Sequence, residues 1–279
     1  MRLGELAIEG VSVAGEETWF RIQPPGLALD AGRGAASLAG TRDLFLSHGH
    51  LDHALGVPYV LSQRTLHHQG ATRIFCPHAI ADDLAALVAA AGRLERIDYR
   101  HEIVPLAAGD RTALARDLTL EAFATDHVVP SLGVHLVRRR HRLCAELAGT
   151  PPDEVAKLRA RGFTVQEEYE EVWLSYCGDT GPGVWDLAPR LGQSRILMIE
   201  CTFLGDGLRA RGAAYGHLHL EDLVERQDEL AAHAAIVLHH LSRRHSVTEL
   251  REAVATRLPG LAERIFIWGE EREPEGAGR

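Results

Sequence analysis

One short segment, residues 47–53 (SHGHLDH), constrains the fold of this chain more than any other. It directly follows the run DLFLS at residues 43–47, an apolar stretch with a polar end that is typical of a buried strand. Four side chains able to bind a metal lie in this segment: His48, His50, Asp52 and His53. A surface loop can be histidine-rich by chance, but the spacing HxHxDH at a strand end is specific enough to predict a metal site.

Residues of metal-ligand type also end three later runs that look like strands. His127 follows LTLEAFATD, Asp179 follows VWLSYC within a Gly-Asp-Thr sequence, and His240 follows AAIVLH. Each of them alone is more often a solvated or internally satisfied polar residue. Four strand ends that all carry such residues are better explained by one shared edge of the fold, with enough ligands for two ions.

Short strands and helices are predicted throughout both halves of the chain. We expect strands at residues 18–22, 26–29, 43–47, 73–76, 102–105, 118–124, 133–137, 172–177, 195–199, 235–239 and 264–268. Helices are expected at 79–94, from a Thr150 cap to Gly162, at 220–232, and from a capping box at Ser246 to 258. This order favours an α/β fold of two packed sheets with helices on the outer faces. We expect a single domain over residues 1–268 and a loose tail at 269–279.

Composition excludes several classes of protein. The 279 residues are 46% hydrophobic and 25% charged, which is typical of globular chains and excludes disordered and fibrous ones. Four cysteines without a CxxC pair exclude a disulfide scaffold and a zinc knuckle. We see no apolar run long enough for a signal peptide or a membrane span, so we expect a cytoplasmic protein. The net charge of −9 implies that any contact with a polyanion is local.

The densest basic run offers such a local contact. Arg138, Arg139, Arg140 and Arg142 follow the strand-like sequence GVHLV, and Arg159 and Arg161 would add to them if the next helix folds back. Two interpretations stay open: a run that contacts phosphates, and a solvated strand end, which is the usual role of a charge run.

Taken together, these motifs resemble a known family. HxHxDH, a single later His, Gly-Asp-Thr and a final strand-end His form the pattern of the metallo-β-lactamase superfamily, which implies an αββα sandwich. The sequences ECTF at 200–203, YGH at 215–217 and HLSRR at 240–244 resemble those of the tRNase Z family, and most closely its short-form enzymes of plant type. The resemblance extends from Asp30 to the end of the final strand.

The resemblance implies which residues would bind each of two metal ions. His48, His50 and His127 would hold one zinc ion, Asp52, His53 and His240 the other, and Asp179 would bridge them together with a hydroxide; manganese or iron could replace zinc. His239 points to the opposite face of its strand from its neighbour, so only one of the two can bind. Asp30 is either a turn residue or the partner that orients a ligand histidine.

Hydrolysis of a phosphodiester is the implied reaction. The resemblance suggests a tRNA 3′-processing endoribonuclease that cuts 3′ of the discriminator nucleotide of precursor tRNA by attack of the hydroxide. Asp52 would serve as general base or orient the water, and His217, tuned by Glu200, would protonate the leaving oxygen. A strand-end carboxylate without a role is the alternative for Glu200. The family is usually homodimeric.

Other functions fit the same motifs. The main alternative is a hydrolase of a small phosphodiester, a cyclic nucleotide or a lactone, because fold and metals do not fix the substrate. A non-catalytic, metal-stabilised RNA-binding protein is a weaker one. The resemblance also implies a long Gly- and Pro-rich arm before Gly-Asp-Thr, whereas residues 143–171 look like a compact helix plus strand and do not predict such an arm.

Overall fold

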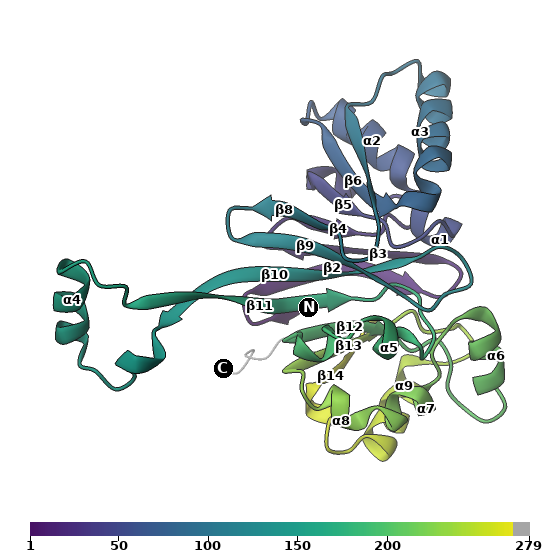
Figure 1. The fold of residues 1–279 in the computed structure, drawn as a ribbon. Coiled ribbons are helices and arrows are strands. Elements are labelled where there is room, and N and C mark those ends of the chain that lie inside the picture. Colours follow the sequence, from purple (N-terminus) through teal and green to yellow (C-terminus); the bar gives the residue numbers. More distant parts are fainter. Residues whose placement is uncertain (270–279) are drawn as a thin grey trace, which may run out of the picture.

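The fold consists of two seven-stranded sheets packed face to face, seen in a computed structural model that describes residues 1–269 (Figure 1). The first sheet contains β1 (Arg2–Leu3), β2 (Leu6–Val13), β3 (Glu17–Gln23), β4 (Leu27–Leu29), β5 (Asp43–Phe45), β6 (Thr72–Pro77) and β7 (His101–Leu106) in that order. The second contains β8 (Arg111–Ala115), β9 (Leu118–Ala124), β10 (Leu132–Leu143), β11 (Gln166–Tyr176), β12 (Ile196–Glu200), β13 (Ala235–His239) and β14 (Ile265–Ile267). Except for residue 269, the predicted tail lies outside the described residues.

Helices cover the outer faces of both sheets and confirm the predicted αββα sandwich (Figure 1). The first sheet carries α1 (Leu51–Ala54), α2 (Val57–Leu66) and α3 (Ala81–Glu95), and the second carries α5 (Val184–Leu187), α6 (Arg209–Tyr215), α7 (Leu220–Glu225), α8 (Gln227–Leu230) and α9 (Val247–Arg257). Single 3₁₀ turns lie at η1 (Ala36–Gly40), η2 (His78–Ile80), η3 (Ala145–Leu147), η4 (Leu191–Gln193) and η5 (Ala262–Arg264).

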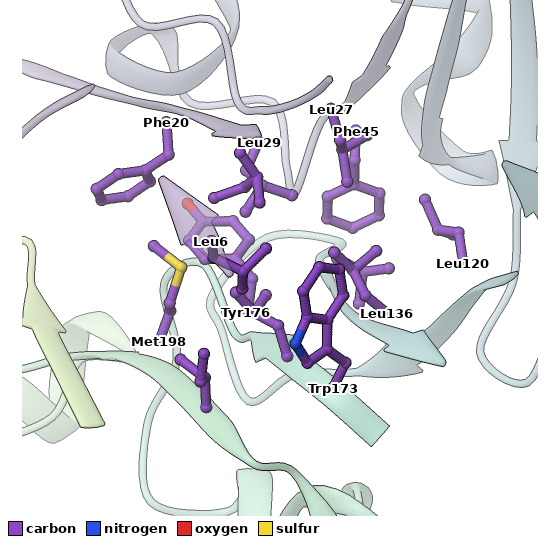
Figure 2. Close-up of a cluster of buried hydrophobic side chains, with 14 of the residues drawn as sticks. Leu6, Phe20, Leu27, Leu29, Phe45, Leu120, Leu136, Trp173, Tyr176 and Met198 are labelled. Atoms are coloured by element: carbon purple, nitrogen blue, oxygen red, sulfur yellow. The ribbon is translucent and has the colours of Figure 1, made fainter. Parts of the chain in front are cut away.

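The main core lies between the two sheets. Figure 2 shows Phe20, Leu29 and Phe45 of the first sheet facing side chains of the second sheet that include Leu136 and Tyr176. All five are fully buried, and burial of one such side chain stabilises the fold by about 1.5–3 kcal/mol. Because neither sheet can bury its inner face without the other, we propose residues 1–268 as one domain.

Most predicted elements are present, but some helix signals were misinterpreted. The capping box at Ser246 is confirmed, with its hydroxyl accepting from the Glu249 backbone N–H at 3.1 Å. Thr150 does not cap its helix, since α4 (Pro152–Ala160) begins after Pro151 with no side-chain cap. The single helix predicted at 220–232 is two short ones, because the backbone leaves helical geometry at Arg226. Strands β1, β2 and β8 and helices α2, α5 and α6 were not predicted.

Strands β10 and β11 are much longer than predicted, and their outer halves form an arm with α4 at its end (Figure 1). The inner residues of β10, Leu132–Val137, are buried, whereas the outer ones alternate between half-buried and exposed. In α4 only Val155 and Leu158 are half-buried, and the other residues are exposed. Residues 143–171 therefore do not form the compact unit that the sequence suggested, because their polar, charged strands have no apolar face to pack on the body.

Candidate metal centre

The strand-end residues singled out in the sequence converge on one edge shared by both sheets. Each of three groups has its ligand atoms within 4.8 Å of one another. The groups are His48, His50, His127 and Asp179; Asp52, His53 and His240; and Asp179, Glu200, His217 and His240. The first two match the two ligand sets that the resemblance implied.

Asp179 lies between these two groups. Its Oδ2 atom is 3.3 Å from Nε2 of His53, 3.3 Å from Nε2 of His240 and 3.7 Å from Nε2 of His48. Oδ2 of Asp52 is 3.7 Å from Nε2 of His240. A carboxylate at this position can bind one ion in each group.

Two buried atoms of this cluster lack a partner among the described residues. Nε2 of His48 and Oδ1 of Asp179 are inaccessible to solvent and make no hydrogen bond. A buried polar atom without a partner costs about 1–3 kcal/mol, and a cation would satisfy both. Imidazole nitrogens and carboxylate oxygens are the donors that zinc prefers, so these residues fit a bound transition metal.

The far nitrogen of most of these imidazoles is held by a hydrogen bond. Nδ1 of His53 lies 2.8 Å from Asp30 and that of His48 2.9 Å from the Ser47 hydroxyl. Nδ1 of His127 contacts the Gly216 carbonyl at 2.9 Å, and Nδ1 of His240 contacts the Thr202 hydroxyl at 3.0 Å. Such contacts fix the ring and leave Nε2 free for an ion. His50 differs, since its Nδ1 is the atom that faces His127, at 3.3 Å.

The charges of the cluster stabilise ionised carboxylates. Burial alone would raise the pKa of Asp52, yet the nearby imidazoles of His240 and His53 lower it to about 2. Burial likewise opposes ionisation of Asp179, but His240 and His53 hold its pKa well below the usual range. Burial and the neighbouring imidazoles lower the pKa of His48. The centre therefore combines anionic carboxylates with a neutral His48, as metal ligation requires.

A histidine–carboxylate pair lies beside the cluster. Nδ1 of His217 is 2.9 Å from Oε1 of Glu200, which is fully buried and also accepts from the backbone N–H groups of Thr180 and Leu218. Burial lowers the pKa of His217, but the Glu200 charge overrides it and raises that pKa to about 9. The His217 ring stacks on His240 with centroids 5.3 Å apart. A protonated imidazole is thus available next to the candidate metal ligands.

The histidine pairs that were ambiguous in the sequence separate clearly. His239 is buried outside the three groups and packs on Phe20 and Tyr176 at 5.3 and 5.4 Å between ring centroids. His219 begins α7, as expected, and caps it with its side chain. Sequence reasoning assigned no role to Ser47 and Thr202, although both lie inside the quoted motifs.

The basic run is paired with carboxylates. Arg138 contacts Glu5 at 2.8 Å, and its guanidinium lies 3.3 Å from the centroid of the Trp173 ring. The other three arginines pair with glutamates of β11: Arg139 with Glu168, Arg140 with Glu171 and Arg142 with Glu167, at 3.4, 3.0 and 2.7 Å. Cross-strand ion pairing therefore accounts for the run, and phosphate contact stays a prediction. Arg159 and Arg161 lie at the exposed end of the arm, because its helix does not fold back.

Comparison with known proteins agrees with this geometry. Residues 20–240 match the model of the β-lactamase superfamily domain. The chain is 30% identical to tRNase Z TRZ2, chloroplastic, of Arabidopsis thaliana, across 91% of this chain and 72% of that protein. It is 29% identical to tRNase Z TRZ1 of the same plant, across 95% and 96%. Human tRNase Z, short form, has the same fold, with a TM-score of 0.60 and 16% identity over 93% of this chain and 95% of that one. The chain belongs to the β-lactamase superfamily and, within it, to the tRNase Z family.

Proposed function

We propose that this protein is a metal-dependent phosphodiesterase that processes the 3′ end of precursor tRNA, cutting 3′ of the discriminator nucleotide. Relatives named tRNase Z match along nearly the whole chain, which supports the substrate class. The observation that carries the reaction type is the His217–Glu200 pair beside the two ligand groups. A proton donor next to a cluster of metal ligands suits hydrolysis with a poor leaving group.

Two zinc ions are the proposed cofactors, with manganese or iron as substitutes. His48, His50 and His127 would hold one ion, Asp52, His53 and His240 the other, and Asp179 both. When bound, such ions supply Lewis-acid activation of water and neutralise charge on the phosphodiester.

Three side chains of the protein would act on protons. Asp52 stays ionised at neutral pH, so it can accept a hydrogen bond from the attacking water and orient it. His217 can donate a proton to the leaving 3′ oxygen, and Glu200 keeps that imidazole protonated. Asp30 would orient His53 through the bond to Nδ1.

The arm supports a role for a second copy of the chain. It extends away from α1, which carries Asp52 and His53, so its tip cannot reach the centre of its own chain (Figure 1). The segment of α1 and α2 exposes a stripe of large apolar side chains that begins next to Asp52: Leu51, Leu55, Tyr59 and Leu66 are 64%, 46%, 45% and 67% exposed. We propose that this stripe is the face of a homodimer in which the arm of one subunit grips the tRNA that the other cuts.

The test is parallel incubation of the purified protein with a 3′-extended precursor tRNA and with a chromogenic bis-aryl phosphate. Cleavage of both substrates is the expected result. Cleavage of the small ester alone would favour the alternative, a hydrolase of small phosphodiesters, cyclic nucleotides or lactones. Binding of RNA without cleavage of either substrate would favour the non-catalytic alternative.

The location in the cell remains a separate prediction. Within residues 1–269, no helix is both long and apolar enough to cross a membrane. Named relatives include a chloroplastic and a nuclear enzyme. We propose a cytoplasmic location, which fractionation of the cells that make the protein would test.

A further inference from the structure

We infer that Tyr176 is a positioning residue of the metal centre, whose hydroxyl fixes Asp30 so that this carboxylate orients one imidazole in each ligand group. The inference rests on the metal centre of the proposed function and does not depend on the identity of the substrate. Tyr176 is not a ligand, and its side chain is fully buried.

The contacts of Asp30 determine which nitrogen of His53 carries the proton. Oδ2 of Asp30 accepts from the Tyr176 hydroxyl at 2.6 Å and from the Ser47 hydroxyl at 2.9 Å, and lies 2.8 Å from Nδ1 of His53. Oδ1 accepts from the Ser47 backbone N–H at 2.7 Å. An ionised carboxylate can only accept, so the His53 proton must be on Nδ1. In the neutral imidazole that metal ligation requires, the lone pair of Nε2 then faces Asp179 and the place of an ion.

Ser47 extends the same control to the other ligand group. Its hydroxyl has one hydrogen, which it donates to Asp30, so its oxygen must accept the proton on Nδ1 of His48, 2.9 Å away. Nε2 of His48, which is buried and otherwise without a partner, is then left as a lone-pair donor. One carboxylate thus sets the tautomers of His48 in the first group and His53 in the second.

Tyr176 supplies the bond that connects this carboxylate to the opposite sheet. Asp30 follows β4 of the first sheet, has a left-handed backbone with φ of 57°, and its N–H donates to the Phe45 carbonyl at 2.7 Å. Tyr176 ends β11 of the second sheet, and its ring is held by Phe20 at 5.8 Å and by stacking on His239 at 5.4 Å. Because the ligands come from both sheets, a rigid hydroxyl across that boundary keeps the two groups in register.

The test compares Tyr176→Phe with the matched control Tyr99→Phe. The Tyr99 hydroxyl also donates to a carboxylate, Oε2 of Glu95 at 2.7 Å, but neither residue belongs to a candidate ligand group. Zinc affinity is measured by competition with a chromogenic chelator, the visible spectrum is recorded with Co²⁺ in place of zinc, and the melting temperature is recorded without metal. We expect about tenfold weaker binding of both ions and a shifted Co²⁺ spectrum in Tyr176→Phe alone.

The outcomes of these measurements either support or contradict the positioning role of Tyr176. Weaker zinc binding at both positions, with a metal-free melting temperature no lower than that of Tyr99→Phe, supports a positioning role. Affinity and spectrum equal to those of the control overturn it, and so does a loss confined to one ion. A wild-type protein that binds zinc but leaves precursor tRNA intact would contradict the proposed substrate and not this inference, since the titration needs no RNA.

Discussion

The same two strands, β10 and β11, are built in opposite ways at their two ends. Their inner halves are buried in the sandwich and lead to the metal centre, where Asp179 follows β11. Their outer halves carry charged side chains that pair across the hairpin and lead to the exposed helix α4. The centre depends on residues far apart in the sequence, whereas the arm depends on neighbours within one hairpin.

This difference implies that the proposed catalysis and the proposed grip of the arm on tRNA are separable. Buried, mutually hydrogen-bonded ligands tolerate little change. Exposed ion pairs contribute little each, so the arm can change without loss of the fold. The predictions below test that separation, starting with the largest expected effect.

Replacement of Asp52 by Ala should lower turnover about 10³-fold, because the attacking water loses its oriented acceptor. Turnover of the bis-aryl phosphate measures this, and circular dichroism should show an intact fold. Normal turnover of this variant would remove Asp52 from the mechanism.

Replacement of Glu200 by Gln should lower turnover of precursor tRNA at pH 8 about 10²-fold. The Glu200 charge raises the pKa of His217 to about 9, so wild-type activity should fall as pH rises through 9, where His217 loses its proton. Without that charge, the fall should occur at lower pH. A pH–rate profile with an unmoved basic limb would contradict the pairing.

Replacement of residues 139–170 by an Asn-Gly turn should raise KM for precursor tRNA about tenfold or more, because the arm contacts are lost. Arg138 of β10 pairs with Glu171 of β11, so the new turn joins two residues that already lie opposite each other. Turnover of the bis-aryl phosphate should be unchanged and serves as the control. An equal loss for both substrates would show that the arm and the centre are coupled.

Acid should destabilise the buried half of the hairpin through His135. This imidazole bonds to Ser175 at 2.7 Å, and its burial, together with Arg190, lowers its pKa to about 3. Between pH 6.5 and 3 the unfolded chain binds a proton that the folded chain does not. The free energy of unfolding therefore decreases by about 1.4 kcal/mol for each unit by which the pH is lowered. His135→Gln should reduce that slope in urea titrations, and an unchanged slope would refute this assignment.

The smallest effect is expected from Arg139→Ala combined with Arg142→Ala on the exposed half. Their pairs with Glu168 and Glu167 are solvent-exposed, so the free energy of unfolding should change by about 1 kcal/mol or less. If both arginines contact tRNA phosphates in place of their glutamates, the slope of log Kd against log salt should be smaller by about 2 in the double variant than in the wild type. A filter-binding salt series with an unchanged slope would eliminate phosphate contact.

The clustering of the candidate ligands was predictable because their chemistry is local in the sequence. HxHxDH follows a short apolar run, and only a few residue types bind zinc, so strand ends that carry them stand out. The same reasoning located His127, Asp179 and His240, which the structure brings to the cluster. Alternation of side chains along a strand left room for only one of His239 and His240, and the resemblance of the following LSRR sequence to the tRNase Z family favoured His240.

The supporting hydrogen bonds were not predictable in the same way. Tyr176 is separated from Asp30 by 146 residues, and a tyrosine in an apolar strand looks like an ordinary core residue. Thr202 reaches His240 only because β12 and β13 are parallel neighbours. Such partners depend on three-dimensional contacts that leave no local pattern.

The arm was missed for a related reason. A run such as RRRHR is typical of a solvated strand end, and EEYEE at 167–171 is polar enough to be a loop. The two segments form one long hairpin only because they pair with each other, with Arg142 opposite Glu167. Register between distant strands is set by pairing and not by the composition of either strand.

That the two sheets share the candidate ligands has a consequence for biogenesis. His48 and His53 follow β5 in the first layer, whereas His240 follows β13, close to the end of the second. On a ribosome, the nascent polypeptide exposes the early histidines long before their partners have been synthesised. The candidate ligand groups are complete only after both layers have docked. We therefore expect metal loading to be a late step, and a bound ion would connect the two layers.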